Sequence, residues 1–330
     1  MVIERSRALS STATMPPSKP APVSSLSHRA EFAALKGLVR ALSALDWNTA
    51  VSIGGRLGAL GYRPLGIRKD VVEKQIAAAF PELDVKGVRR MARASFEHLG
   101  KSSIETALLP TLGEKGVLGI VRQVDGWEHM ERAIDGKKGV VVVAGHHGNW
   151  ELLGAYIAAR GVPIDVIVRG MSNKLFDDYL NETRTLLGMT VVHDREAVRR
   201  TPRSLRGGRA VAFVADQGVL GLASTFVPFF GRPAKTPRGA AVFALRFNAP
   251  VLFVDALRLP DGKYQIVIEP IEAAASGNTD RDVDAIILRF TQVLESWVRR
   301  FPEQYFWQHR RWRRQPPDTP PELRDPTREK

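Results

Sequence analysis

The residues best suited to chemistry lie in the segment 145–151, whose sequence is GHHGNWE. Within it, His146 and Glu151 are five positions apart. An imidazole can remove a proton from a hydroxyl group when a carboxylate accepts the N–H of its other ring nitrogen, because that bond fixes the tautomer. The segment therefore predicts a general base, His146, and a carboxylate that orients it, Glu151.

This spacing places a condition on the local structure. In a regular helix, five positions correspond to a rotation of about 140°, which would separate the two side chains. The pairing therefore requires His146 to precede the first helical turn, and Gly148 permits the necessary bend. A His-x4-Glu spacing is weak evidence by itself, because short patterns of this kind often arise by chance.

The elements around the segment place it at the edge of a sheet. The run GVVVVA at 139–144 predicts a buried strand before it, and WELLGAYIAAR at 150–160 predicts an apolar helix after it. In open α/β sheets, sites form at the carboxyl ends of strands, where the amides of a following helix can hold negative charge. The segment is therefore expected at such an edge.

Strands and helices alternate along the rest of the chain. Strands are expected at 163–168, 210–215, 250–256 and 264–269, and helices at 173–187, 198–206, 237–247 and 280–301. This alternation predicts an α/β fold with a mostly parallel sheet flanked by helices.

The N-terminal third is expected to be helical, with helices over 31–60, 71–80 and 88–109. Apolar residues recur at helical spacing in 31–60, and Lys36, Arg40 and Arg56 interrupt them. This pattern fits a helix pair packed on the core, and it fits equally well a membrane-facing amphipathic hairpin with its cations at headgroup level.

The expected organisation is a single domain between two tails. A Ser/Pro-rich composition predicts a disordered tail over 1–30. The domain covers 31–316, with a helical part at 31–110 and an α/β part at 111–316, and a polar tail follows at 317–330.

The composition limits the possible chemistry and partners. The chain has 48 lysines and arginines against 35 acidic residues, a net charge of +13, which favours phosphate-bearing or acidic partners. It has no cysteine, which excludes disulfides, thiolate zinc sites and a cysteine nucleophile. No run reaches the roughly 18 apolar residues of a spanning helix, and the N-terminus lacks the apolar core of a secretion signal.

Several motifs together resemble the bacterial lipid A late acyltransferases, the lauroyl and myristoyl transferase family. GHHGNWELLGAY resembles the family's first block, a His-x4-Asp/Glu pattern followed by an apolar helix. Further segments match in the same order, and the resemblance covers residues 55–316. They are KQIAAAFPEL, VDGWEHMERAIDGKKGVVVVA, VADQGVLGLASTFVPFFGRPAKTPRGAAVFALRFNAPVLF and PEQYFWQHRRWRRQP.

The resemblance implies a reaction, a fold and a location. It implies transfer of a fatty acyl chain from a carrier thioester to a hydroxyl of a lipid A precursor, on a glycerol-phosphate-acyltransferase-like fold. Relatives of the family resemble enzymes that acylate other glycolipids or lysophospholipids, so such a lipid is the alternative acceptor. No cofactor or metal and no covalent acyl-enzyme is expected. The donor would be an acyl carrier protein thioester or acyl-CoA, and an acidic carrier suits the basic chain. The expected location is the cytoplasmic face of the inner membrane, with peripheral or amphipathic attachment.

The resemblance also suggests substrate-binding residues, each with an ordinary alternative. Arg169 follows a predicted strand and would meet a phosphate or the reacting centre, unless it is a plain surface arginine. Asp216 ends another strand and would orient the acceptor or cap a loop. Arg232, Lys235 and Arg238 would form a basic loop for a lipid phosphate, or a solvated loop.

Two other classes of function remain as rivals. His146, His147 and Glu151 could be ligands of a metal-dependent hydrolase, although no second cluster has ligand spacing. The aromatic and basic run at 299–314 would suit single-stranded nucleic acid, and it would suit a lipid interface equally well. The motifs above favour the lipid interface, so nucleic acid is not expected as a partner.

Overall fold

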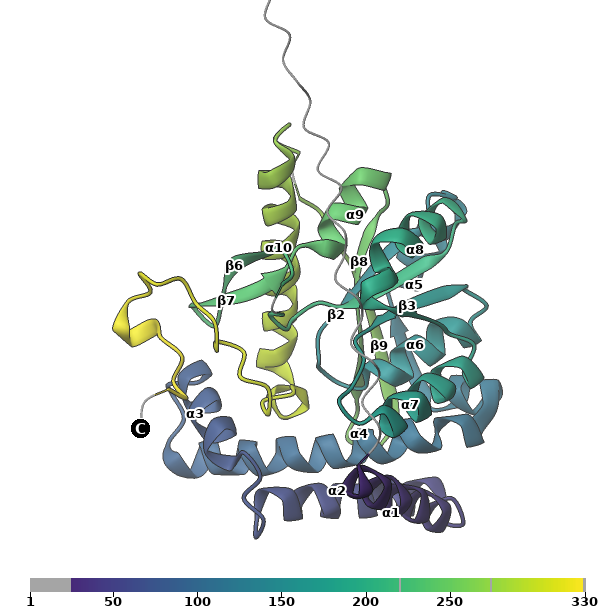
Figure 1. Cartoon of the computed structure of the whole chain (residues 1–330), viewed down its shortest axis with the longest axis vertical. Helices are drawn as coiled ribbons and strands as arrows, with labels where there is room; N and C mark the ends of the chain where they lie inside the picture. Colours follow the sequence, from purple (N-terminus) through teal and green to yellow (C-terminus); the bar gives the residue numbers. More distant parts are fainter. Residues whose placement is uncertain (1–24, 220, 274, 329–330) are drawn as a thin grey trace, which may run out of the picture.

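The computed structural model describes residues 25–219, 221–273 and 275–328, and it shows an α/β fold (Figure 1). Seven strands form one sheet in the order β1-β9-β8-β2-β5-β3-β4. Five neighbouring strands, from β8 to β4 in that order, run parallel, whereas β9 pairs with β8 in the antiparallel sense. The predicted class, a mostly parallel sheet flanked by helices, is confirmed.

Short, β-branched segments form the strands, and the central ones are buried on both sides. The sheet strands are β1 (Val121–Asp125), β2 (Val140–Ala144), β3 (Ile164–Val168), β4 (Thr190–His193), β5 (Ala210–Val214), β8 (Val251–Arg258) and β9 (Tyr264–Pro270). A separate antiparallel hairpin consists of β6 (Ser224–Phe229) and β7 (Arg232–Pro237).

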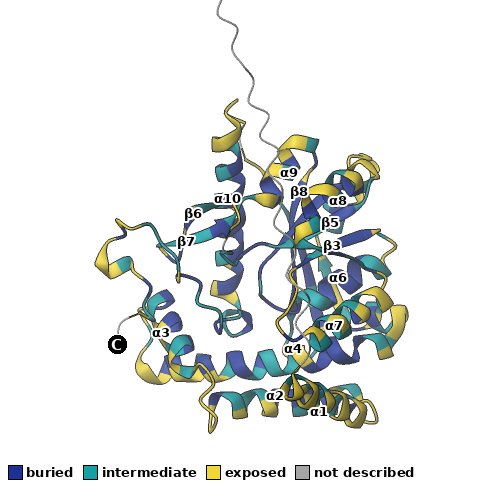
Figure 2. Cartoon of the chain, viewed as in Figure 1, coloured by how far each residue is buried: buried dark blue, intermediate teal, exposed yellow. Residues whose placement is uncertain are grey.

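Helices cover both faces of the sheet, and the strands are dark in the burial view (Figure 2). Along β2, Val141 and Val143 pack on one face, whereas Val140 and Val142 pack on the other. The first face is covered by α8 (Asp194–Arg206), α9 (Gly239–Phe247) and α10 (Thr279–Arg300), and the second by α5 (Trp127–Asp135), α6 (Trp150–Ala159) and the end of α4. Next to α6 lies α7 (Lys174–Leu186).

The N-terminal helices form a layer beside the sheet, as Figure 1 shows. They are α1 (Leu26–Leu42), α2 (Trp47–Tyr62), α3 (Lys69–Ala79) and α4 (Val85–Gly119), which has a break at Gly113. A small core of Leu42, Ala50, Ile104 and Leu108 joins α1 and α2 to α4. Among the described residues, no helix is both long and apolar enough to cross a bilayer.

The structure adds elements that the sequence patterns did not predict. These are β1, α5, β4 and the β6–β7 hairpin. Prolines interrupt both strands of the hairpin, and β4 has only four residues, so neither gave a clear strand pattern. At the turn of the hairpin, Phe229 and Phe230 are buried, and Phe230 and Gly231 have positive φ angles.

The structure describes parts of the two expected tails. Helix α1 begins at Leu26, within the segment predicted to be disordered, and residues 1–24 lie outside the described part. The polar segment after residue 316 packs against the domain: Thr319 and Asp325 are buried, and Asp325 forms an ion pair with Arg310 at 2.7 Å.

Candidate active site

A tight loop joins β2 to α6 and carries His146. The chain turns at Gly148, where φ is +58°. A Cβ atom there would lie 2.1 Å from the carbonyl oxygen of Ala256, so only glycine fits. Asn149 caps α6, and its side-chain oxygen accepts a hydrogen bond from the Leu152 amide at 3.0 Å. His146 therefore precedes the first turn of the helix.

The segment after α10 holds this loop in place. The Phe306 amide donates to the His146 carbonyl oxygen at 2.9 Å, and the Gly148 amide donates to the Gln304 carbonyl oxygen at 3.1 Å. Backbone bonds on both sides of His147 thus tie the loop to residues far along the chain. The position of the histidine consequently depends on the C-terminal segment as well as on β2.

The carboxylate that contacts His146 is Asp216. The Nδ1–H of His146 donates to Asp216 Oδ1 at 2.6 Å. Sheet register explains this contact, because β2 and β5 are parallel neighbours that pair Ala144 with Val214. His146 and Asp216 each come two residues after these paired positions, so they leave the sheet side by side. The ring remains partly open to solvent, with 22% of the side chain exposed.

Asp216 is completely buried and has two further polar neighbours. The Tyr305 hydroxyl donates to Asp216 Oδ2 at 3.1 Å, and the buried Arg311 guanidinium adds positive charge nearby. Burial alone would raise the pKa of Asp216, but attraction to His146, its hydrogen bonds and Arg311 outweigh burial and hold the pKa well below its ordinary value. Asp216 is therefore an ionised acceptor for the His146 ring.

Glu151 does not contact His146, contrary to the pairing expected from their spacing. Instead, Arg184 of α7 donates to Glu151 Oε2 from Nε at 2.9 Å and to Oε1 from Nη2 at 2.5 Å. Both side chains are largely buried, with 13% of Glu151 and 15% of Arg184 exposed. Because Glu151 lies in the first turn of α6, its carboxylate faces α7 and not the loop that precedes the helix. A catalytic role for Glu151 stays a prediction.

The second histidine, His147, belongs to a separate buried pair. Its Nδ1 bonds to Asp255 Oδ2 at 2.5 Å, and its Nε2 bonds to the Phe301 carbonyl oxygen at 3.0 Å. Burial alone would lower the pKa of His147, but Asp255 and the Phe301 carbonyl outweigh burial and raise it. A ring that donates from both nitrogens links β8 to the C-terminal segment, so His147 holds the loop in position.

Below the loop, α4 contributes a buried polar cluster. Asn149 donates to Glu105 Oε2 at 3.2 Å, the Tyr264 hydroxyl donates to the same oxygen at 2.5 Å, and Arg258 forms an ion pair with Glu105. From the same helix, His98 bonds to the Gly148 carbonyl oxygen at 3.0 Å. The long helix α4 therefore supports the loop from beneath.

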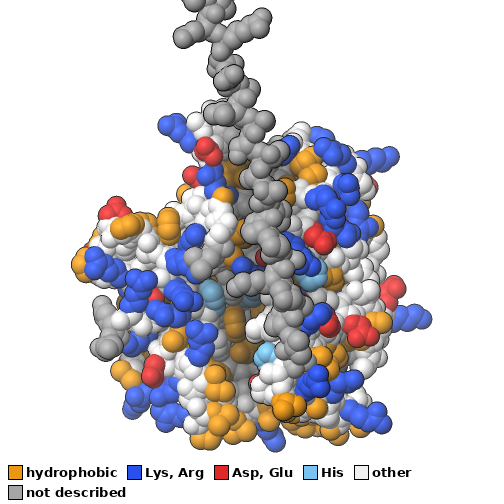
Figure 3. Space-filling view, viewed as in Figure 1, with side chains coloured by type: hydrophobic (Ala, Val, Ile, Leu, Met, Phe, Trp, Pro, Cys, Tyr) orange, Lys and Arg blue, Asp and Glu red, His pale blue; other side chains and the backbone are white. Residues whose placement is uncertain are grey.

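A basic pocket of about 330 Å³ adjoins Asp216. Arg169, Gln217, Gly218 and Lys235 line it, together with His309 and the arginines at 310, 311, 313 and 314. No carboxylate is among these lining residues. Lysine and arginine also far outnumber acidic side chains on the face shown in Figure 3. A pocket of this composition can bind a phosphate group beside His146.

Two of the three cations expected to form a phosphate-binding loop have protein partners elsewhere. Arg232 donates to the carbonyl oxygens of Glu322 and Arg324 at 2.8 and 2.9 Å. Arg238 pairs with Asp280 at 2.7 Å. Only Lys235 of this group lines the basic pocket. Arg232 lies three residues before it on β7 and so points to the other side of the strand, whereas Arg238 follows the strand. Arg169 lines it too, with a long contact of 3.7 Å to Asp194.

The environment of His309 makes it a neutral ring near neutral pH. Burial lowers the pKa of His309 to about 4, with further lowering by His146, Arg311 and Arg68, against the opposing effect of Asp216. A neutral imidazole between Asp216 and the arginines can accept or donate a hydrogen bond to a polar substrate.

Sequence patterns missed Arg184, His309 and Asp255. Asp255 had a usable signal, because an acid inside the apolar strand sequence VLFVDALR needs a buried partner. Arg184 and His309 had none: one is an ordinary helix arginine, and the other lies within a basic run. Their roles depend on neighbours that are distant in sequence.

The three residues considered as metal ligands have different partners. His146 bonds to Asp216, His147 to Asp255 and Glu151 to Arg184. Across the described part of the chain, no group of three or more His, Cys, Asp or Glu side chains is arranged to hold a metal ion.

The chain resembles known proteins over most of its length. Residues 24–314 match the family model of bacterial lipid A biosynthesis acyltransferases. The chain is 27% identical over 278 residues to a lipid A biosynthesis lauroyltransferase of Escherichia coli, a match that covers 84% of this chain and 89% of the relative. It is also 27% identical over 266 residues to the palmitoleoyltransferase of that organism, with 80% and 85% covered.

A third relative carries a different name. A phosphatidylinositol mannoside acyltransferase of Mycobacterium tuberculosis is 28% identical over 225 residues, which cover 65% of this chain and 67% of the relative. All three relatives are acyltransferases, and the family model matches most of the chain. The chain therefore belongs to the bacterial lipid A biosynthesis acyltransferase family and is an acyltransferase.

Proposed function

We propose that this protein transfers a fatty acyl chain from a carrier thioester to a hydroxyl of a lipid A precursor. The observation that carries the proposal is the contact between His146 and the buried, ionised Asp216, next to a pocket of cations. The contact suits a general base, and the pocket suits an acceptor that bears phosphate. The lipid A acyltransferase relatives support the same acceptor.

The chemistry follows from the orientation of His146. Its Nδ1–H donates to Asp216, so Nε2 carries the free lone pair. In the proposed step, Nε2 takes the proton of the acceptor hydroxyl while the hydroxyl oxygen forms a bond to the thioester carbonyl carbon. The tetrahedral intermediate then collapses, the C–S bond breaks, and the thiolate leaves with the proton from the imidazolium. General-base catalysis of this kind contributes about 10²–10⁴-fold to the rate.

The negative charge that develops on the carbonyl oxygen needs donors nearby. The first amides of α6, those of Trp150 and Glu151, have no acceptor among the described residues. These amides follow the His146 loop directly, so we assign them to the developing oxyanion. The ion pair of Glu151 with Arg184 would then fix the start of α6.

We propose an acyl carrier protein thioester as the donor, with acyl-CoA as the alternative. The support is electrostatic, because a chain with a net charge of +13 attracts an acidic carrier protein. A coenzyme A thioester also carries phosphates, so a direct comparison of the two donors is needed.

We further propose that the enzyme acts at the cytoplasmic face of the inner membrane, attached peripherally. Exposed apolar side chains on and beside α1 and α2 support this location, among them Leu26, Leu45, Leu57 and Leu60. Such side chains next to arginines are typical of a helix that lies in the interfacial zone of a bilayer.

A second class of acceptor lipid should be tested in parallel. The match to the mycobacterial relative favours a phosphoinositide glycolipid as an alternative acceptor. Both acceptors present hydroxyls near a phosphate, so the basic pocket suits either of them.

The test is a transfer assay with purified full-length protein and a labelled acyl carrier protein thioester. The acceptors are a lipid A precursor, the same lipid without phosphate, and a phosphatidylinositol mannoside. Wild type is compared with His146→Ala, and with His193→Ala as a control, because His193 lies at the end of β4, outside the basic pocket. We expect label in the phosphorylated lipid A precursor with wild type and with the control, but not with His146→Ala.

The pocket is tested separately with Lys235→Gln and Arg313→Gln, and Arg289→Gln on the exposed side of α10 is the matched control. We expect each pocket variant to raise KM for the phosphorylated acceptor about tenfold, since a charged hydrogen bond contributes about 1.5–3 kcal/mol. The acceptor without phosphate should show no such difference. Transfer to the mannoside alone would mean that the acceptor is a phosphatidylinositol mannoside. An active His146→Ala variant would refute the mechanism.

A further inference from the structure

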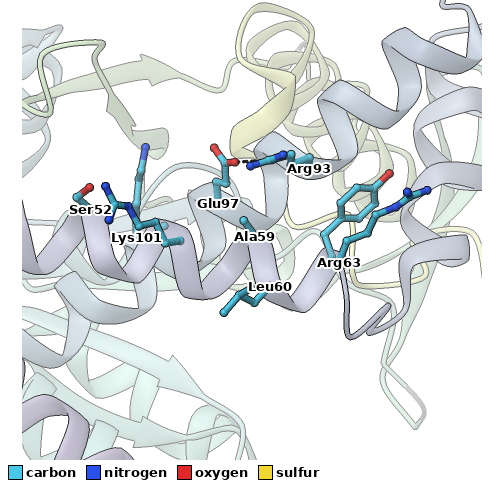
Figure 4. Close-up of a pocket in the computed structure, with 10 residues that line it drawn as sticks. Ser52, Ala59, Leu60, Arg63, Arg93, Glu97 and Lys101 are labelled. Carbon is cyan, nitrogen blue, oxygen red and sulfur yellow. Dashed lines mark hydrogen bonds and ion pairs between the residues drawn. The ribbon is translucent and has the colours of Figure 1, made fainter.

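A second basic groove lies between α2 and α4, at residues that the catalytic centre does not use (Figure 4). Its volume is about 450 Å³. The residues drawn in Figure 4 come from both helices, with Ser52 and Leu60 from α2 and Arg93, Glu97 and Lys101 from α4. Arg63 directly follows α2.

Glycines bring these two helices together and so create the groove. A Cβ at Gly58 would lie 2.0 Å from the Phe96 carbonyl oxygen, and one at Gly100 would lie 2.1 Å from the Gly54 carbonyl oxygen. The backbones are therefore in direct contact. At this separation, side chains spaced by one helical turn on each helix border the same groove.

The charge in the groove is unbalanced. The cations are Arg56, Arg63, Arg93 and Lys101, and the one acid is Glu97. Arg93 donates to Glu97 at 2.9 Å, so this acid already has a partner. Within the described part of the chain, neither Arg56 nor Lys101 forms a salt bridge, and the groove consequently favours an anion.

Apolar side chains border the same cations. Leu60 lines the groove and is 48% exposed, and Leu57, one turn before it, is 41% exposed. Beyond Arg63, the loop exposes Leu65 and Ile67, at 68% and 55%. Cations at the mouth of a groove with leucines beside them match the boundary between lipid headgroups and acyl chains.

We propose that this groove binds the phosphate of an anionic phospholipid headgroup, with the neighbouring leucines in the acyl-chain zone. The inference rests on the membrane attachment proposed above, and it does not depend on the acyl-transfer step. The positive charge favours an anionic ligand. The exposed leucines favour a lipid surface, because an acidic protein would leave these leucines without an apolar partner.

The groove is separate from the catalytic centre because α4 lies between them. Glu97 borders the groove, whereas His98, the next residue and about 100° away around the helix, bonds to the Gly148 carbonyl oxygen. The groove and the basic pocket have no lining residue in common. Lys101 also lowers the pKa of His98, but burial is the largest cause of that low pKa. Substitutions in the groove are therefore expected to leave His98 neutral and the chemistry intact.

The experiment measures sedimentation of the full-length protein with phosphatidylcholine vesicles, with and without phosphatidylglycerol. The groove variant is Arg56→Gln/Lys101→Gln. The matched control is Arg199→Gln/Arg203→Gln on the exposed side of α8, which removes the same charge elsewhere. We expect the groove variant to bind phosphatidylglycerol vesicles about tenfold more weakly than wild type, and the control to change about twofold or less.

Thermal unfolding checks that both variants are folded, and two further assays separate the alternatives. Equal losses in the two double variants would show a diffuse charge effect and overturn the site, as would binding that does not depend on phosphatidylglycerol. If the groove variant lost binding to free acyl carrier protein but bound vesicles as wild type does, the groove would be assigned to an acidic protein instead. Acyl transfer in detergent should be unchanged in the groove variant, so a failure of that reaction in wild type would refute the proposed function without affecting the vesicle result.

Discussion

Three carboxylates surround the loop that carries His146, and each accepts hydrogen bonds from its own partner. Asp216 accepts from His146, Asp255 from His147, and Glu151 from Arg184. The contacts are short and largely shielded from water, which strengthens each of them. Substitution of one carboxylate should therefore mainly affect the residue with which it pairs.

Substitution Asp216→Asn should lower kcat about 10²–10⁴-fold with little change in KM. The amide cannot hold the Nδ1–H tautomer as an ionised carboxylate does, so the general base is lost. Steady-state kinetics with the acyl carrier protein donor would measure this effect. Tyr305→Phe is the control, since it removes only the 3.1 Å bond to the other oxygen, and it should cost less than about tenfold. Near-normal kcat in Asp216→Asn would refute the role of this carboxylate.

Arg184→Ala and Glu151→Ala should behave as a coupled pair. Breaking a largely buried ion pair leaves one charge without a partner, so we expect each single variant to lose about 3 kcal/mol of unfolding free energy. The double variant should lose clearly less than the sum, as measured by urea unfolding. If Glu151 acts only through Arg184, all three variants should show the same kcat. A lower kcat in Glu151→Ala than in Arg184→Ala would indicate a direct role for the carboxylate.

At the scale of elements, the contact between α2 and α4 determines the shape of the N-terminal layer. Both helices have glycines at the crossing, where their backbone atoms are in contact. A side chain at these positions would prevent that contact. The same crossing buries Ala50, Ile104 and Leu108. The apolar spacing at 31–60 fitted both a packed helix pair and a membrane-facing hairpin. The structure shows that some of these apolar residues pack on α4.

Substitution Gly58→Ala should destabilise the protein by about 1–3 kcal/mol, because its Cβ would lie 2.0 Å from the Phe96 carbonyl oxygen and push the helices apart. Gly61→Ala, on the same helix, is the matched control, since its Cβ would meet Phe96 at an ordinary 3.4 Å. That control should be neutral or stabilising, given the better helix propensity of alanine. Equal unfolding free energies of the two variants would show that the crossing tolerates a side chain.

At the scale of the whole molecule, the loop at 145–149 is where four distant segments meet. The C-terminal segment binds it through Gln304 and Phe306, β8 through Asp255, the segment after β5 through Asp216, and α4 through His98. The geometry of the site therefore depends on the complete fold.

The buried His98 should make stability depend on pH below about 6.5. Burial lowers the pKa of His98 to about 3, with further lowering by Arg258, His147 and Lys101 and an opposing effect from its bond to Gly148. Between these two pH values the unfolded chain binds a proton that the folded chain does not, so stability falls as pH falls, by about 1.4 kcal/mol per pH unit. At higher pH this contribution is fully present.

The measurement is urea unfolding of wild type and His98→Gln at pH 7 and pH 5. Other titrating groups are common to both proteins, so the difference in slope isolates His98. We expect wild type to lose about 2 kcal/mol more than the variant between the two values. Identical pH dependence would mean that His98 is not held neutral by burial.

Local sequence determined much of this protein. The β-branched run at 140–144, the bend at Gly148 and the apolar helix after it specify a strand, a loop and a helix with His146 between them, because each depends on neighbouring residues. The alternation of such units also predicted the α/β class. The motifs identified the family, which the comparison confirmed.

Tertiary structure alone decided which residues meet at the site. Asp216 contacts His146 because β2 and β5 are parallel neighbours in a defined register, and no local pattern encodes which strands are adjacent. Contacts with distant residues likewise decided which cations line the pocket: Arg238 pairs with Asp280, whereas Lys235 lines the pocket. Strand order and ion pairing result from contacts between segments far apart in the chain, and these exist only once the whole core has assembled.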